Sequence, residues 1–111
     1  MKGNCYFIVI LFLISSGFGF IDHGNYCLCG SKEDCQKAIL SCNYIKTDKN
    51  IDNLEVIDKR NITIDCNNNK IRSIEIKNSN GKIMNCIFER GWICLSVDGN
   101  FNISKNQFRF C

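Results

Sequence analysis

Several residue types are scarce in this 111-residue chain, and each scarcity narrows the choice of structure and function. Proline is absent, so every backbone N–H is available for the hydrogen-bond ladders of a β-sheet. The single histidine, His23, has no serine or cysteine motif beside it that would form a nucleophilic site. An excess of one sign of charge is lacking as well. Beyond Lys2 there are 13 basic and 11 acidic side chains, and the two signs are interspersed. Nucleic acid, which needs a basic stripe, is therefore excluded as a partner.

Long hydrophobic runs are absent outside the amino terminus. There, Lys2 precedes an apolar run over residues 6–14, and small residues follow at Ser15, Ser16, Gly17 and Gly19. This order predicts a secretory signal peptide over residues 1–19, cleaved after Gly19, and hence a secreted, extracellular protein. The run is too short for the roughly 20 residues that span a bilayer. The alternative is an uncleaved anchor, and a membrane is an expected partner in that case alone.

Cysteine, in contrast, is abundant. About 92 residues follow the predicted signal, a size at which a core alone gives marginal stability, so we expect covalent staples. An even number of cysteines in a short secreted chain predicts a disulfide framework, although eight allow 105 pairings. Zinc is disfavoured because the closest cysteine pair has too tight a spacing, and we expect no metal and no cofactor. The disulfide candidates are Cys27, Cys29, Cys35, Cys42, Cys66, Cys86, Cys94 and Cys111.

A second feature is a repeat at an offset of 20 residues between about residues 53 and 108. A repeat of this length is typical of a stacked fold, in which each unit buries its apolar face against its neighbours. Aligned residues then lie one strand spacing apart, about 4.8 Å, which is within the reach of a disulfide. Cys66 is thus expected beside Cys86, and Cys94 near Cys111. The aligned sets are Leu54, Ile74 and Cys94; Glu55 and Glu75; Val56 and Ile76; Cys66 and Cys86; Ile83 and Ile103; and Phe88 and Phe108.

The chain divides into three predicted parts: the signal over residues 1–19, a Cys-rich N-terminal cap over 20–50, and stacked repeats over 51–111. Within the cap, Ser31 and Asp34 predict the start of a short helix over residues 32–41. We expect this helix to cover the open end of the stack, the alternative being a small recognition module. Residues 43–52 are predicted to be a connector. Strands are predicted over residues 54–57, 62–66, 71–77, 82–88, 93–97 and 101–104, with turns at 67–69, 78–81 and 98–100.

Segments 62–69, 74–78, 81–88 and 102–108 resemble the coils of right-handed parallel β-helix, pectin-lyase-like proteins, in which an aliphatic strand precedes an asparagine turn and a phenylalanine. The resemblance implies an all-β fold, a short right-handed parallel β-helix of about two to three coils with a small N-terminal helical cap. The tandem aspartates, the Gly-His-Gly element and the Arg-Ile-Lys element of polygalacturonases are missing. No catalytic residue is therefore assigned, and a solvated role is favoured for Glu55 and Glu75 over calcium or sugar binding.

The remaining candidates lie on the predicted surface. Trp92 beside Gly91 is a candidate ligand contact, since exposed tryptophan stacks on sugars. The alternative is an aromatic residue that seals the last coil, as expected of Phe101, Phe108 and Phe110. Asn61 and Asn102 begin N-glycosylation sequons. The sequence thus favours a non-enzymatic extracellular interaction module with a glycan or protein partner. The alternatives are a polysaccharide lyase or hydrolase relative and a small cysteine-rich secreted effector.

Overall fold

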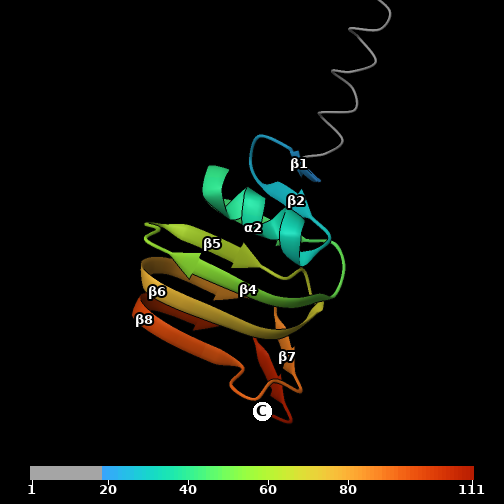
Figure 1. The fold of residues 1–111 in the computed structure, drawn as a ribbon, viewed down its shortest axis with the longest axis vertical. Helices are drawn as coiled ribbons and strands as arrows, with labels where there is room; N and C mark the ends of the chain where they lie inside the picture. The colour runs from blue at the N-terminus through green and yellow to red at the C-terminus, as the bar shows by residue number, and fades with distance from the viewer. Residues whose placement is uncertain (1–18) are drawn as a thin grey trace, which may run out of the picture.

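The computed structural model describes residues 19–111, so the predicted signal peptide lies almost wholly outside the described part (Figure 1). These residues form a mostly β structure in which nine strands belong to one mixed sheet and one short helix packs beside it. The elements are β1 Phe20–Asp22, β2 Cys27–Cys29, α2 Lys32–Ser41, β3 Tyr44–Thr47, β4 Ile51–Ile57, β5 Ile62–Asp65, β6 Lys70–Met84, β7 Ile87–Glu89, β8 Leu95–Ser104 and β9 Gln107–Arg109.

The helix α2 forms where the capping pattern predicts it. The Ser31 side chain accepts a hydrogen bond of 3.1 Å from the backbone N–H of Asp34, which satisfies one of the free donors at the helix start. The helix contacts β1, β2, β3 and β4 and buries Cys35, Ala38 and Ile39. Leu40 follows these residues but is 80% exposed, so the buried face of the helix is confined to Cys35, Ala38 and Ile39.

Most strands pair in parallel with the strand that lies one repeat further along the sequence. β4 pairs with β6 so that Leu54 lies beside Ile74, and Glu55 beside Glu75. The second half of β6 pairs with β5 and with β8, and Ile83 there lies beside Ile103. Among the described strands only β1 runs antiparallel, against β2. The predicted alignments are therefore confirmed for these residues.

The predicted ladder of Leu54, Ile74 and Cys94 is wrong at its third member. Leu95, rather than Cys94, lies beside Ile74, so the offset from β6 to β8 is one residue longer at this point. The Cys94 carbonyl instead accepts a hydrogen bond of 3.0 Å from the Ile74 N–H, and its side chain bonds to Cys111. The disulfide thus takes Cys94 out of the ladder and Leu95 replaces it.

Two predicted turns are bends within continuous strands. β6 runs through residues 78–81 and β8 through residues 98–100, with a shift of pairing register between Ile76 and Ser79. Asn78 makes the bend possible by adopting a left-handed conformation with φ of 48°. At Gly99, where φ is 139°, a Cβ atom would collide with the Ser79 carbonyl of the neighbouring strand. The Asn and Gly residues therefore bend the backbone without ending the pairing.

The predicted connector over residues 43–52 is also wrong, because it contains β3 and the first residues of β4. Ile45 in β3 is fully buried and lies beside Ile64 of β5. Only Ile45 and Thr47 face inward in this strand. With two inward residues, the alternation of buried and exposed positions is too brief to be recognised as a strand from the sequence. β1 and β2, for which no strand is predicted from the sequence, are each three residues long and therefore show no longer periodic pattern either.

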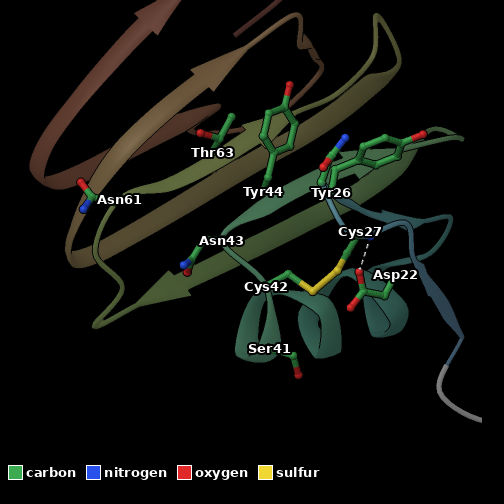
Figure 2. Close-up of a pocket in the computed structure, with 11 residues that line it drawn as sticks. Asp22, Tyr26, Cys27, Ser41, Cys42, Asn43, Tyr44, Asn61 and Thr63 are labelled. Atoms are coloured by element: carbon green, nitrogen blue, oxygen red, sulfur yellow. Dashed lines mark hydrogen bonds between the residues drawn. A yellow bond between two sulfur atoms is a disulfide. The ribbon is translucent and has the colours of Figure 1, made fainter.

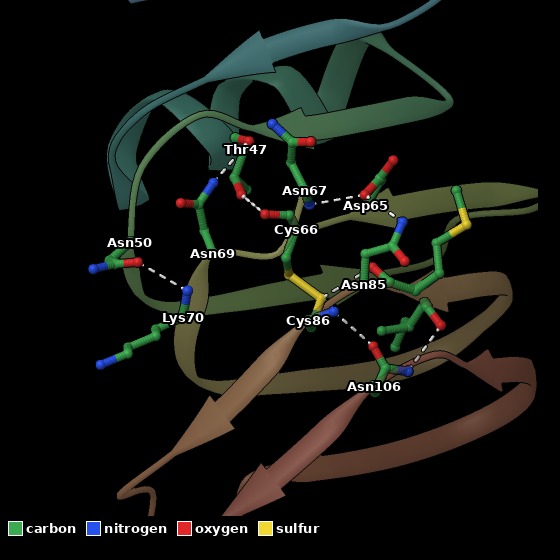
Figure 3. The surroundings of a disulfide bond; sticks show 12 residues. Thr47, Asn50, Asp65, Cys66, Asn67, Asn69, Lys70, Asn85, Cys86 and Asn106 are labelled. Atoms are coloured by element: carbon green, nitrogen blue, oxygen red, sulfur yellow. Dashed lines mark hydrogen bonds between the residues drawn. A yellow bond between two sulfur atoms is a disulfide. The ribbon is translucent and has the colours of Figure 1, made fainter.

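Polar side chains connect neighbouring layers wherever the chain bends. The Asp65 carboxylate accepts hydrogen bonds from the Asn67 backbone at 2.8 Å and the Asn85 side chain at 3.1 Å (Figure 3). The Asn106 side chain likewise accepts from the Cys86 backbone at 2.9 Å. The hydrogen bonds of Asn85 and Asn106 join residues that lie one repeat apart in the sequence. These asparagine side chains therefore connect one layer to the next.

Eight cysteines form four disulfides, Cys27–Cys42, Cys29–Cys35, Cys66–Cys86 and Cys94–Cys111. The first two connect α2 and the residue after it to β2. The third joins two adjacent layers in the core, as the repeat offset predicts, and the fourth matches the pairing expected at the far end. Multiple disulfides in so short a chain are typical of extracellular proteins.

Candidate functional site

A groove of about 450 Å³ lies beside the amino-terminal strands (Figure 2). The segment between β1 and β2, the end of α2, the start of β3 and the approach to β5 all contribute to it. Its lining is predominantly polar, with two tyrosine rings and the Cys27–Cys42 disulfide as its larger apolar surfaces. The lining residues are Asp22, Gly24, Asn25, Tyr26, Cys27, Ser41, Cys42, Asn43, Tyr44, Asn61 and Thr63.

A row of side chains continues from this groove across the sheet. Tyr44 pairs with Thr63, Thr63 with Lys82, and Lys82 with Asn102, so these residues share the outer face of β3, β5, β6 and β8. Tyr26 begins the row, with its ring 6.3 Å from that of Tyr44. A second hollow of about 270 Å³ follows the row and is lined in part by Thr63 and Lys82. Two aromatic rings are thus followed by a hydroxyl, an amine and an amide.

Contacts with His23 and Lys46 hold the Tyr26 ring in place. The His23 ring lies 4.9 Å away at a tilt of 34°, and the Lys46 ammonium lies 4.4 Å from the Tyr26 ring centroid. A cation at this distance is attracted to the electron-rich face of the ring. The ring therefore has a defined orientation beside the groove before any ligand binds.

The Tyr44 hydroxyl is held by a buried acid. It donates a hydrogen bond of 3.2 Å to Asp65, a residue that is only 5% exposed. Burial, followed by the negative charge of Asp65 and by this hydrogen bond, raises the pKa of Tyr44 above its usual value of 10.0. Because Asp65 also accepts from Asn67 and Asn85, its lone pairs are largely occupied and it acts as a support for Tyr44.

This arrangement predicts a change of stability in alkaline solution. Folding raises the pKa of Tyr44, so the protonated hydroxyl contributes to the free energy of unfolding. This contribution is fully present below the unfolded pKa of about 10 and is lost as pH rises through the higher folded pKa. In a spectrophotometric titration of the tyrosines, Tyr44→Phe identifies the transition that belongs to Tyr44, and we expect Asp65→Asn to lower the pKa of Tyr44. An unchanged titration in Asp65→Asn would show that the acid has no influence on Tyr44.

Of the ligand-contact and glycosylation candidates predicted from the sequence, only Asn61 lies at this groove. Asn61 lines it, whereas Asn102 is exposed at the other end of the row on β8. Trp92 is 97% exposed on the connection between β7 and β8, outside the groove, so it does not seal the last layer. Glu55 and Glu75 are exposed neighbours, and Glu75 forms an ion pair of 3.7 Å with Lys77, which agrees with a solvated role. Use of Trp92 as a ligand contact and glycosylation of both asparagines stay predictions.

Sequence reasoning missed the tyrosines. Tyr26 and Tyr44 are separated by the whole of α2, and neither belongs to a recognisable motif. A usable signal was the repetition of a tyrosine one residue before Cys27 and Ile45, which pair in the sheet. That signal is visible only once β2 and β3 are recognised as neighbouring strands.

Comparisons with protein families, with curated proteins and with solved structures find no match to this chain. Among residues 19–111, no helix is long and apolar enough to cross a membrane. The groove and the row of residues beside it are therefore the features of the described residues that bear on function.

Proposed function

We propose that this is a secreted, non-enzymatic protein that binds an extended saccharide along the row from Tyr26 to Asn102. The observation that carries the proposal is the adjacent pair of tyrosine rings, continued across neighbouring strands by hydroxyl, amine and amide groups. Aromatic faces pack against the apolar faces of sugar rings, while the polar groups bind hydroxyls. Over four strand spacings the row is about 19 Å long. A chain of several sugars fits this length better than a single sugar.

The charges beside the row favour a saccharide that bears carboxylates. Lys82 lies in the row itself, and Lys46 lies against Tyr26 at its beginning. Of the two carboxylates nearby, Asp65 is buried and accepts hydrogen bonds from Tyr44, Asn67 and Asn85. Asp22 therefore remains the one exposed carboxylate among the residues that line the groove. Lys82 is thus an exposed positive charge in the row, Asp22 is the exposed negative charge at its beginning, and the charge of Asp65 lies buried beneath Tyr44.

The carboxylates near the groove favour saccharide binding over glycoside hydrolysis. Glycoside hydrolysis ordinarily uses two carboxyl groups that face each other across the bond to be broken. In the groove Asp22 is exposed, whereas Asp65 is held by its three donors beneath Tyr44. A lectin-like role needs no such pair.

For the architecture, we propose a short right-handed parallel β-helix similar to the pectin-lyase-like proteins, with α2 and the first strands as its N-terminal cap. The parallel registers between successive strands, each about one repeat apart in sequence, support stacked coils. The packing of α2 against β2, β3 and β4 supports a cap at the first coil. Four disulfides and the predicted signal peptide support secretion.

Titration calorimetry with oligogalacturonate, and with a neutral galactan fragment of matched length, tests the binding proposal. We expect tighter binding of the acidic oligosaccharide, and a loss of about tenfold in affinity, about 1.4 kcal/mol, on Tyr44→Ala. Trp92→Ala is the matched aromatic control and should leave affinity unchanged. Because Asn61 lines the groove, the protein is first treated to remove N-glycans.

Absence of binding to both saccharides, with native disulfides and circular dichroism retained, would contradict the proposal. Loss of binding in Trp92→Ala but not in Tyr44→Ala would assign the site to the exposed tryptophan instead. Release of unsaturated or shortened sugars during the measurement would identify an enzyme.

A further inference from the structure

Asn61, one of the two sequon asparagines, lies at the edge of the row that runs from Tyr26 to Asn102. It is exposed and lines both the groove of about 450 Å³ and the second hollow of about 270 Å³ (Figure 2). It directly precedes β5, and Thr63, two residues further on, pairs with Tyr44 in the row. At about 3.3 Å per residue and about 4.8 Å between strands, the Cα atoms of Asn61 and Tyr44 are about 8 Å apart. A sugar attached to the Asn61 side chain therefore begins within reach of the Tyr44 ring.

Hydrogen bonds hold the backbone of Asn61, while the residue stays exposed. The Asn61 N–H donates a hydrogen bond of 2.7 Å to the Asn80 side-chain oxygen, and the Asn80 N–H donates one of 3.0 Å to the Lys59 carbonyl. These bonds fasten the connection between β4 and β5 to β6. The attachment point thus has a defined position beside the row, which reduces the conformational freedom that attached sugars lose when they bind there.

The surface between Asn61 and Tyr44 suits the first sugars of an N-glycan. These sugars are N-acetylhexosamines, which are uncharged and have apolar ring faces and methyl groups. The Tyr44 ring can pack against such faces, while the Thr63 hydroxyl and the Asn43 amide can bond to sugar hydroxyls. Gly81 lines the second hollow, and a glycine within a strand leaves room for another group to approach closely.

We infer that a glycan attached to Asn61 lies along the row toward Tyr44 and excludes a free saccharide, so that modification of this sequon regulates the site. This role rests on the proposed binding of saccharides by the row. Tethering gives the attached sugars an effective concentration in the millimolar range. Where this concentration exceeds the dissociation constant of the attached sugars by about tenfold, a free saccharide binds about tenfold more weakly.

The modification is a group transfer to the sequon from a diphosphate-linked oligosaccharide donor. The Asn61 amide nitrogen forms a bond to the anomeric carbon of the donor, and the bond from that carbon to the diphosphate oxygen breaks. The diphosphate leaves with the bonding electron pair, and one amide proton is released. The product is a neutral amide that carries the oligosaccharide beside the row.

Release of the glycans by an endoglycosidase from the natively folded protein, made in secretory eukaryotic cells, tests where the Asn61 glycan lies. Asn102 is the matched site, because it is also exposed but lies three strand spacings, about 14 Å, from Tyr44 along the row. We expect release at Asn61 to be about tenfold slower than at Asn102, because bound sugars are protected. Tyr44→Ala should remove this difference, whereas Tyr44→Phe, which keeps the ring, should retain it. Glycopeptide mass spectrometry measures both rates.

Titration calorimetry with oligogalacturonate measures the regulation of the row. We expect Asn61→Gln, which cannot carry the glycan, to bind about tenfold more tightly than the glycosylated protein. Asn102→Gln is the matched control and should bind as weakly as the glycosylated protein, because the Asn61 glycan still occupies the row.

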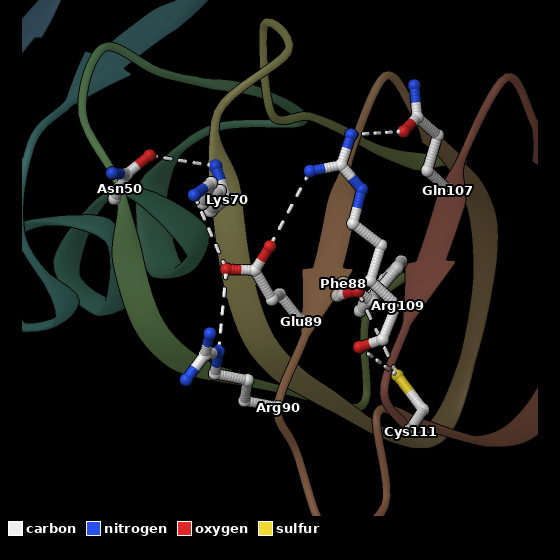
Figure 4. A network of polar contacts seen from close by, with 8 residues as sticks. All are labelled: Asn50, Lys70, Phe88, Glu89, Arg90, Gln107, Arg109 and Cys111. Carbon is white, nitrogen blue, oxygen red and sulfur yellow. Dashed lines mark hydrogen bonds and ion pairs between the residues drawn. The ribbon is translucent and has the colours of Figure 1, made fainter.

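A second control addresses a cluster of charges on another part of the sheet. The Glu89 carboxylate lies 3.3 Å from the Lys70 ammonium and 3.6 Å from the Arg109 guanidinium (Figure 4). The Arg90 guanidinium lies 3.9 Å from the same carboxylate. Three basic groups around one acid leave an excess of positive charge, which attracts an acidic saccharide. Arg109→Gln removes one of these charges and should leave the affinity of Asn61→Gln for oligogalacturonate unchanged.

Secretion with an unmodified Asn61 would overturn the inference, and so would equal release rates at Asn61 and Asn102 or slow release that persists in Tyr44→Ala. Equal affinities of the glycosylated protein and Asn61→Gln would overturn it as well. Loss of binding in Arg109→Gln would place oligogalacturonate at the cluster around Glu89 and contradict both proposals. Absence of oligogalacturonate binding in every form, with the Asn61 glycan protected by Tyr44, would contradict the proposed function and support a row that holds the chain's own glycan.

Discussion

Replacement of Cys66 and Cys86 together by alanine is expected to lower the free energy of unfolding by about 3 kcal/mol. The bond joins residues with a sequence separation of 20, and closing such a loop removes about this much conformational entropy from the unfolded chain. Both residues are at most 1% exposed, so the substitution also leaves space in the core. Because small domains are stable by only about 5–15 kcal/mol, this is a large fraction of the total.

Urea denaturation followed by circular dichroism measures the effect of this double substitution. The matched control is the replacement of Cys94 and Cys111 by alanine, which opens a loop of similar length, with a sequence separation of 17. Loop entropy alone predicts about 3 kcal/mol for the control as well. However, Cys111 is exposed at the end of the chain, so little core packing is lost with it. A cost below about 1 kcal/mol for the Cys66 and Cys86 pair would contradict its place in the core.

Phe88→Ala is expected to cost about 3–5 kcal/mol, the range for removing a fully buried aromatic side chain. Phe88 is 0% exposed, and its ring is stacked on Phe108 with only 5° between the planes. The substitution leaves a cavity between β7 and β9 and removes the ring contact as well. Thermal or urea unfolding of the intact disulfide-bonded protein measures this loss.

Phe110→Ala provides the control for Phe88→Ala. Phe110 is 80% exposed and lies near the Arg90 guanidinium, 5.9 Å from its ring centroid, so we expect a change within about 0.5 kcal/mol. Equal losses in the two variants would show that Phe88 is not a core residue. Together the two substitutions distinguish the buried Phe88 from an exposed aromatic residue near the end of the sheet.

The repeat offset was the strongest signal in the sequence because it reflects a physical spacing. Residues that lie beside each other in adjacent layers share one environment, so Val56 resembles Ile76 and Phe88 resembles Phe108. The same logic correctly placed Cys66 beside Cys86. It failed at Cys94 because one additional residue lies between β6 and β8, a local irregularity that composition does not reveal.

Other parts of the structure could not be predicted, for two physical reasons. β3 is short and has only two inward residues, so its pairing with β5 depends on tertiary contacts rather than on a local pattern. The tyrosine groove is built from Tyr26 and Tyr44, which come together only because α2 folds back between β2 and β3. Trp92, in contrast, was recognisable from its place beside Gly91, but the structure leaves it apart from the groove.

The parallel stacking of layers that follow one another along the chain is the central feature of this structure, and a disulfide map of the protein tests it most directly. Proteolysis without reduction, followed by mass spectrometry of the linked peptides, identifies each bond. We expect Cys66 joined to Cys86 and Cys94 joined to Cys111, with Cys27–Cys42 and Cys29–Cys35 in the amino-terminal part. A bond from Cys66 to any cysteine between residues 27 and 42, with Cys86 paired elsewhere, would contradict the stacked arrangement and favour a compact cysteine-rich fold.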